Sequence, residues 1–148
     1  MQRNLQEVKS IIDVNIKKLI EEFNISLIYV FGSYAKGTNT ENSDLDIGIL
    51  INGDTSLMTR LSVLNEMVGI LDREDIDLII LNEADEVLKF QVIKYGKLIY
   101  VRDLTEKVLF EARTMSEYMD MEHFRNTRNK YMDIRFKEAF GSRTERED

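Results

Sequence analysis

Apolar residues recur along the chain with two periods, and these periods predict helices and strands in turn. Three- and four-residue steps predict an amphipathic helix over residues 3–23. Two continuous apolar runs, SLIYVF at 26–31 and LDIGILI at 45–51, are typical of buried strands. A second helical stripe follows over 57–71, and IDLIIL at 76–81 predicts a third buried strand.

The rest of the chain predicts one more strand between two helices. A short helix near 84–95 is expected to end at Gly96, a residue suited to the left-handed cap position. Residues 98–101 predict a fourth strand. Asp103 and Glu106 then have capping-box spacing at the start of a long segment whose apolar residues recur at helical intervals to about residue 138.

Elements in this order predict an α/β (α+β) fold in which a small mixed sheet is flanked by helices. Only about a dozen residues join the first two strands, too few for a comfortable parallel crossover, so a mixed or antiparallel sheet is expected. No proline-rich or Gly/Ser linker divides the chain. We expect a core over 1–103, a helical extension over 104–140 that packs on the core or on a partner, and a disordered tail over 141–148.

Composition narrows the class of protein. The chain of 148 residues has 27 acidic and 20 basic residues, and a net charge of -7 repels a phosphate backbone, so nucleic acid is not expected as the substrate. Cysteine is absent, which excludes disulfides, thiolate zinc sites and a cysteine nucleophile. Neither a secretory leader nor an apolar stretch of the roughly 20 residues needed to span a bilayer is found, so we expect a cytoplasmic protein without membrane contact.

Candidate chemistry lies at 31–49, in the sequence FGSYAKGTNTENSDLDIGI. Because side chains alternate along a strand, Asp44 and Asp46 lie on one face. Two like charges among apolar neighbours are costly unless a cation neutralises them, and a pair of Mg²⁺ ions together with substrate phosphates would do so. Gly32 allows the backbone to approach a phosphate closely, and Ser33 offers its hydroxyl and its backbone N–H.

A third carboxylate, Asp77, lies in the strand at 76–81 among apolar residues, which makes it the natural third metal ligand. Three carboxylates and two ions could hold a nucleotide for in-line attack at phosphorus. An alternative reading has the first two aspartates as a solvated strand start and the Gly-Ser pair as an ordinary turn. Asp75 shares the face of Asp77, so the REDID cluster could also be a charged strand edge.

Together Gly32, Ser33, Asp44, Asp46 and Asp77 match the signature Gly-Ser, short spacer, Asp-x-Asp and distant third Asp. The chain thereby resembles the DNA polymerase β nucleotidyltransferase superfamily. Its size and the run GSYAKGTNTENSDLDIGIL resemble the minimal nucleotidyltransferases of MntA type, the antitoxins of HEPN ribonuclease toxins. One departure from the family pattern is a lysine at position 36, where many members carry arginine.

This resemblance implies a polymerase β-like core and transfer of AMP from ATP to a tyrosine hydroxyl of a HEPN-type toxin, in a hetero-oligomer. It implies that Asp44 and Asp46 ligate both Mg²⁺ ions, and that Asp77 also helps to deprotonate the attacking hydroxyl. The chain lacks the Arg-x(4–6)-His element of the HEPN toxins, since nine residues separate Arg113 from His123, and this favours the antitoxin side of the pair.

Two other functions stay open: a small-molecule nucleotidyltransferase of aminoglycoside type, and an antitoxin that acts by binding alone. The first usually brings a larger helical domain, whereas only the segment after Asp103 is available here. Tyr34 and Lys36 are expected to be exposed loop residues, and His123 a surface residue. One group of apolar residues in the last helix suits core and interface equally: Met115, Tyr118, Met119, Met121, Tyr131, Met132 and Phe136.

Overall fold

A computed structural model describes residues 4–147, with side chains described as far as Ala139. The chain alternates helices and strands much as the sequence predicts. Its elements are α1 (Leu5–Phe23), β1 (Ile25–Phe31), α2 (Ser33–Lys36), β2 (Leu45–Ile51), α3 (Leu57–Leu71), β3 (Ile76–Ile80), α4 (Glu86–Tyr95), β4 (Lys97–Val101) and α5 (Leu104–Glu147).

The four strands form one mixed sheet in the order β3-β2-β1-β4. β1 is antiparallel to both β2 and β4, whereas β2 and β3 are parallel. The connection from β1 to β2 holds only the short helix α2, so β2 returns beside β1 in the opposite direction. Between β2 and β3 the longer helix α3 supplies the crossover that a parallel pair needs. The prediction of a mixed sheet is therefore confirmed.

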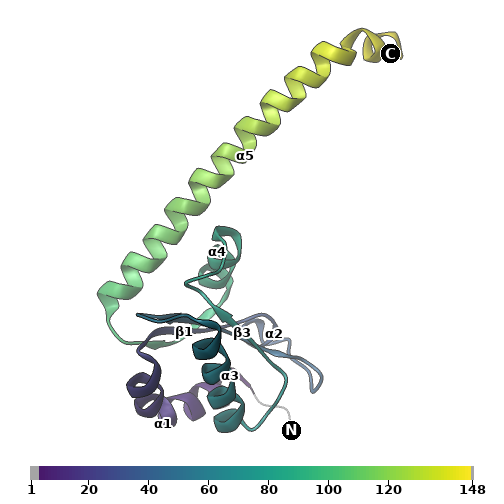
Figure 1. The fold of residues 1–148 in the computed structure, drawn as a ribbon. Helices are drawn as coiled ribbons and strands as arrows, with labels where there is room; N and C mark the ends of the chain where they lie inside the picture. Colours follow the sequence, from purple (N-terminus) through teal and green to yellow (C-terminus); the bar gives the residue numbers. More distant parts are fainter. Residues whose placement is uncertain (1–3, 148) are drawn as a thin grey trace.

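Helices cover both faces of the sheet (Figure 1). α1 and α3 pack on one face over the larger core, which includes Val30 and Ile47. α4 and the first part of α5 cover the other face over a smaller core, where Phe31 packs against buried Tyr29. The alternation of side chains along each strand thus divides the sheet between the two cores.

The first turns of α5 are tied to the sheet and to α4. The hydroxyl of Tyr29 donates to Glu111 at 2.8 Å, and the rings of Phe90 and Tyr118 stack with their centroids 3.9 Å apart. Beyond these contacts α5 extends away from the rest of the molecule (Figure 1). The two halves of α5 therefore differ: one is part of the domain and the other projects from it.

Helical backbone in α5 continues to Glu147, past the end that the sequence predicts. The disordered tail expected over 141–148 stays a prediction, with helical backbone described as far as Glu147 and Asp148 outside the described residues. No proline interrupts this segment, and a single Gly141 costs only about 1 kcal/mol in a helix. None of the described helices is long and apolar enough to cross a membrane.

Gly96 departs from its expected conformation. It has φ -77° and ψ 171°, which is extended backbone, so the predicted left-handed cap is wrong. A Cβ at this position would lie 2.3 Å from the carbonyl oxygen of Val92 and 3.2 Å from that of Val30. Glycine is therefore favoured here because the carbonyl oxygen of Val92, in the last turn of α4, leaves no room for a Cβ.

The predicted capping box at the start of α5 is only half formed. Asp103 accepts a hydrogen bond from the backbone N–H of Thr105 at 2.9 Å. Glu106 instead accepts two hydrogen bonds from the guanidinium of Arg102, at 3.0 and 2.8 Å. The charged partner takes the glutamate away from the helix N-terminus, because a forked ion pair is stronger than a single bond to a neutral N–H.

Candidate active site

The turn after β1 brings Gly32 against the carboxylate of Asp46. β1 and β2 pair so that Phe31 lies opposite Asp46, and the next residue, Gly32, has φ 70°. A Cβ on Gly32 would lie 2.1 Å from Oδ2 of Asp46. α2 begins at Ser33, and its N-cap residue is Gly32. Because glycine has no side chain, this N-cap makes no side-chain hydrogen bond. The predicted Gly-Ser turn and one predicted carboxylate are thus neighbours.

Asp46 and Asp77 are partners in the parallel register of β2 and β3. Burial, then the charge of Asp77 and a hydrogen bond with it, and last the charge of Asp44, raise the pKa of Asp46 to about 6. Asp46 is half-buried, whereas Asp44 and Asp77 are exposed. The charges of Asp44 and Asp77 therefore both act on Asp46.

Asp75 has a different environment from Asp77. Its carboxylate accepts two hydrogen bonds from Arg73, from Nε and from Nη2, each at 2.6 Å. Hydrogen bonding by Arg73 holds the pKa of Asp75 below its usual value. The charge of Asp75 is thus neutralised within the fold, whereas Asp77 lies beside another carboxylate, Asp46. The two aspartates of the REDID cluster therefore have different partners, a guanidinium for Asp75 and a carboxylate for Asp77.

Arg73 also joins the other segments of this region. Its Nη1 donates to the hydroxyl of Tyr34 at 2.6 Å, and its Nη2 donates to the carbonyl oxygen of Ser43 at 3.0 Å. One guanidinium therefore connects α2, the residue before Asp44 and the start of β3. Sequence reasoning missed Arg73, and the only available signal was its position two residues before Asp75 in a charged cluster.

The environment predicted for Tyr34 is wrong, since only 2% of this side chain is exposed. Its ring packs in the core beneath α1 and α3, and its hydroxyl has Arg73 as a partner. Amphipathic side chains of this kind bury the ring and keep the polar tip bonded. Lys36 and His123 are exposed, as expected.

The donor set fits a hard divalent cation, because Mg²⁺ prefers carboxylate oxygens together with phosphates and water. Asp46 and Asp77 already lie together, and the charge of Asp44 reaches them. Within residues 4–147, no three His, Cys, Asp or Glu side chains converge as a ready-made ligand cluster. The side chain of Asp44 is exposed to solvent. The chemistry of the residues fits, although the cluster is not preassembled.

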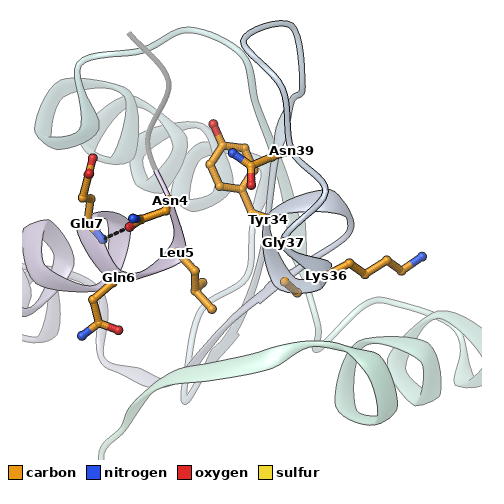
Figure 2. A pocket seen from close by; sticks show the side chains of 9 residues that line it. Asn4, Leu5, Gln6, Glu7, Tyr34, Lys36, Gly37 and Asn39 are labelled. Atoms are coloured by element: carbon orange, nitrogen blue, oxygen red, sulfur yellow. Dashed lines mark hydrogen bonds between the residues drawn. The ribbon is translucent and has the colours of Figure 1, made fainter.

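Two of the cavities formed by the described residues border α2. One of about 650 Å³ lies between α2 and the first turn of α1, where Asn4 caps the helix by accepting from the N–H of Glu7 at 2.9 Å (Figure 2). The other, of about 290 Å³, lies between the end of β1 and α4. Its lining residues are Phe31, Gly32, Lys36, Leu88, Gln91 and Tyr95. The smaller cavity therefore includes Gly32, the residue that contacts Asp46.

Most of the apolar α5 residues left open between core and interface are exposed. Met119, Tyr131 and Phe136 are each about 60% exposed, so they are not core residues of this chain. Tyr118 is the exception, because its ring stacks on Phe90 of α4. The exposed set leaves the projecting half of α5 with several large apolar side chains in solvent.

Comparisons with known proteins agree with this fold. The model of the family described as "Polymerase beta, Nucleotidyltransferase" matches residues 14–105. Protein adenylyltransferase MntA of Shewanella oneidensis is 33% identical over 121 residues, which cover 82% of this chain and 81% of that protein.

Solved structures give the same relationship. A chain in a toxin–antitoxin crystal structure with AMP-PNP superposes with a TM-score of 0.64 at 32% identity, over 84% of this chain and 98% of that one. Another, from a complex of the tri-AMPylated Shewanella oneidensis HEPN toxin with its MNT antitoxin, has a TM-score of 0.57 at 28% identity, with the same coverage. The chain therefore belongs to the polymerase β nucleotidyltransferase family, on its MntA-like branch.

Proposed function

We propose that this nucleotidyltransferase is an antitoxin that transfers AMP from ATP to a tyrosine hydroxyl of a HEPN-type ribonuclease toxin and thereby silences it. The observation that carries the proposal is the group formed by Gly32, Asp46 and Asp77 at one end of the neighbouring strands β1, β2 and β3. Similarity to MntA of Shewanella oneidensis supports AMP as the group transferred, and the AMP-PNP complex of a relative supports ATP as its source.

Two Mg²⁺ ions would be held by Asp44, Asp46 and Asp77. When bound, the ions neutralise the carboxylates and the triphosphate and stabilise the attacking and leaving oxygens. Without a cation the half-buried Asp46 is disfavoured as a carboxylate, as its raised pKa of about 6 indicates. Gly32 and Ser33 would hold the phosphates, because the turn exposes backbone N–H groups at the start of α2.

The order of strands supports in-line transfer. Across the sheet, Asp77 on β3 comes first, Asp46 on β2 lies in the middle, and Gly32 follows β1. The acceptor oxygen would approach from the Asp77 side and form a bond to the α-phosphorus. The bond from the α-phosphorus to the bridging oxygen would break, pyrophosphate would leave toward Ser33 with the electron pair, and the phenol proton would pass to Asp77.

A protein acceptor is favoured over a small molecule by the exposed apolar residues on the projecting half of α5. Such side chains are more typical of a surface that another protein covers than of a pocket for a sugar. The complexes in which the related antitoxins were solved contain a HEPN toxin, which supports that class of partner.

The test is to incubate the chain with a HEPN-type partner, α-labelled ATP and Mg²⁺, and to map the label by mass spectrometry. We expect AMP on a tyrosine of the partner and loss of its ribonuclease activity. A chelator and the Asp46→Asn variant serve as controls, and both should abolish labelling. An inhibited but unlabelled partner would favour neutralisation by binding alone, whereas label only on an added aminoglycoside would favour the small-molecule enzyme.

A further inference from the structure

The pairing of strands decides which cavity shares a face with the carboxylates. Asp46 lies opposite Phe31 on β1 and opposite Asp77 on β3. Directly paired residues point to the same side of a sheet. Phe31 packs in the smaller core beneath α4, and so does Ile79, two residues beyond Asp77. The carboxylates therefore emerge on the α4 face.

The two cavities beside α2 lie on opposite faces of the sheet. The larger one is formed by α1 and by Tyr34, whose ring belongs to the core under α1 and α3 (Figure 2). The smaller one is formed by Phe31, Gly32 and residues of α4. Only the smaller cavity combines the carboxylate face with Gly32, the residue in contact with Asp46.

The lining of the smaller cavity suits a flat ring with a polar edge. Phe31 and Tyr95 supply aromatic surface. Tyr95 is 57% exposed, and the ammonium of Lys94 lies 5.3 Å from the centre of its ring, which leaves the opposite side of the ring for a ligand. Gln91 offers an amide that can both donate and accept, and Lys36 places a cation at the rim. About 290 Å³ is at the small end of the range of roughly 300–1,000 Å³ for ligand pockets, which suits one ring system better than a whole nucleotide.

In-line transfer leaves this direction free for the nucleoside. The acceptor beside Asp77 and the leaving pyrophosphate beside Ser33 occupy the axis that runs across the strands. The nucleoside is attached to the same phosphorus and has to leave that axis sideways. On the face where the carboxylates emerge, the neighbouring hollow between β1 and α4 is the smaller cavity.

We infer that the cavity between the end of β1 and α4 binds the nucleobase of the nucleotide substrate, with the ring against Phe31 and Tyr95 and its polar edge toward Gln91. This inference rests on the proposed function, since it places one part of the ATP that the proposed reaction consumes. It assigns α4 a role in nucleotide selection in addition to its packing on the sheet.

The test measures binding of two probes by calorimetry in the presence of Mg²⁺: an ATP analogue that cannot be cleaved at the α-phosphate, and inorganic tripolyphosphate, which has no base. Tyr95→Ala removes the open ring, and Gln91→Trp fills the cavity. Base stacking on an aromatic side chain contributes roughly 1–3 kcal/mol, so both variants should weaken binding of the ATP analogue on the order of tenfold. Both variants should leave the affinity for tripolyphosphate unchanged. Tyr95→Phe, which keeps the ring, should bind the ATP analogue as tightly as the wild-type chain does.

Matched controls are Tyr131→Ala and Asn126→Trp, two exposed positions on the projecting half of α5, which should change neither affinity. Unchanged affinity for the analogue in both cavity variants would overturn the inference. If those variants instead raised only the KM for the protein acceptor, the cavity would belong to the acceptor side chain. If the wild-type chain did not bind the analogue in the presence of Mg²⁺, that result would contradict the proposed function itself.

Discussion

Gly32 and Asp46 touch across the first strand pair, because Oδ2 of Asp46 lies 2.1 Å from the place where a Cβ on residue 32 would stand. The backbone at Gly32 has φ 70° and ψ -148°, a region that only glycine adopts readily. A single missing side chain thus lets a strand carboxylate lie beside the turn that is proposed to hold phosphates.

Replacing this glycine should disable transfer more than it unfolds the protein. In Gly32→Ala the methyl group displaces the carboxylate of Asp46, and a shift of about 1 Å at a reacting centre costs on the order of 100-fold in rate. Backbone strain should lower the free energy of unfolding by about 1–3 kcal/mol. Gly37→Ala is the matched control, since Gly37 also has positive φ, at 75°, but a Cβ there meets nothing within 4 Å. Equal loss of transfer in both variants would contradict the argument.

Removing the charge of Asp46 and removing the charge of Asp75 should change the free energy of unfolding in opposite directions. The pKa of Asp46 is raised from 3.8 to about 6, so the folded state binds a proton more readily than the unfolded state, and this group lowers stability as pH rises through that window. With a chelator present at pH 7, Asp46→Asn should therefore raise the free energy of unfolding, by up to about 1 kcal/mol after solvent screening. The gain should vanish below about pH 4, where the unfolded carboxyl is also protonated.

Asp75→Asn provides the contrast. Arg73 lowers the pKa of Asp75, so this carboxylate adds stability above its unfolded pKa, and that stability is lost as pH falls through the folded value. The variant should be less stable than wild type at pH 7. Urea denaturation from about pH 3 to pH 7 tests both signs. A loss of stability in Asp46→Asn at pH 7 would contradict the cost of holding a charged, half-buried Asp46 beside Asp77.

Arg73 should affect turnover as well as stability, because it holds the residue before Asp44 and the hydroxyl of Tyr34. Lysine keeps the charge but cannot form the two-bonded ion pair with Asp75. Arg73→Lys should therefore lower the free energy of unfolding by about 1–2 kcal/mol and lower kcat by roughly tenfold. Arg102→Lys is the control, since it breaks a similar fork, to Glu106, away from the carboxylates. Paired denaturation and kinetic measurements decide the matter, and a normal kcat in Arg73→Lys would mean that the network is structural only.

The boundary for removing α5 follows from its contacts. A cut after Asp103 would also remove Glu111 and Tyr118, which hold α5 to Tyr29 and Phe90, and should destabilise the domain. A cut after Asp120 keeps those contacts. We expect the chain that ends at Asp120 to keep the melting temperature and the ATP affinity of the full chain but to lose labelling of the toxin. Full labelling by this chain would show that the partner docks on another surface.

The sequence by itself determined the elements and the residues that bear the chemistry. Apolar runs of six or seven residues predict strands wherever the chain is buried on both faces, and β2 was predicted with its observed ends, Leu45 and Ile51. Charged residues inside such runs stand out, because burying them is costly. For that reason Asp46 and Asp77 could be selected before any contact between them was known.

Tertiary structure decided what depends on which distant segments meet. Only the parallel register of β2 and β3 places Asp46 beside Asp77, and only the fork from Arg73 distinguishes Asp75 from Asp77. The burial of Tyr34, whose hydroxyl meets Arg73, likewise depends on a neighbour far along the chain. Periodicity reports on residues within a few positions of one another, whereas register, close approach of backbones and ion pairing arise between elements that the pattern treats as independent.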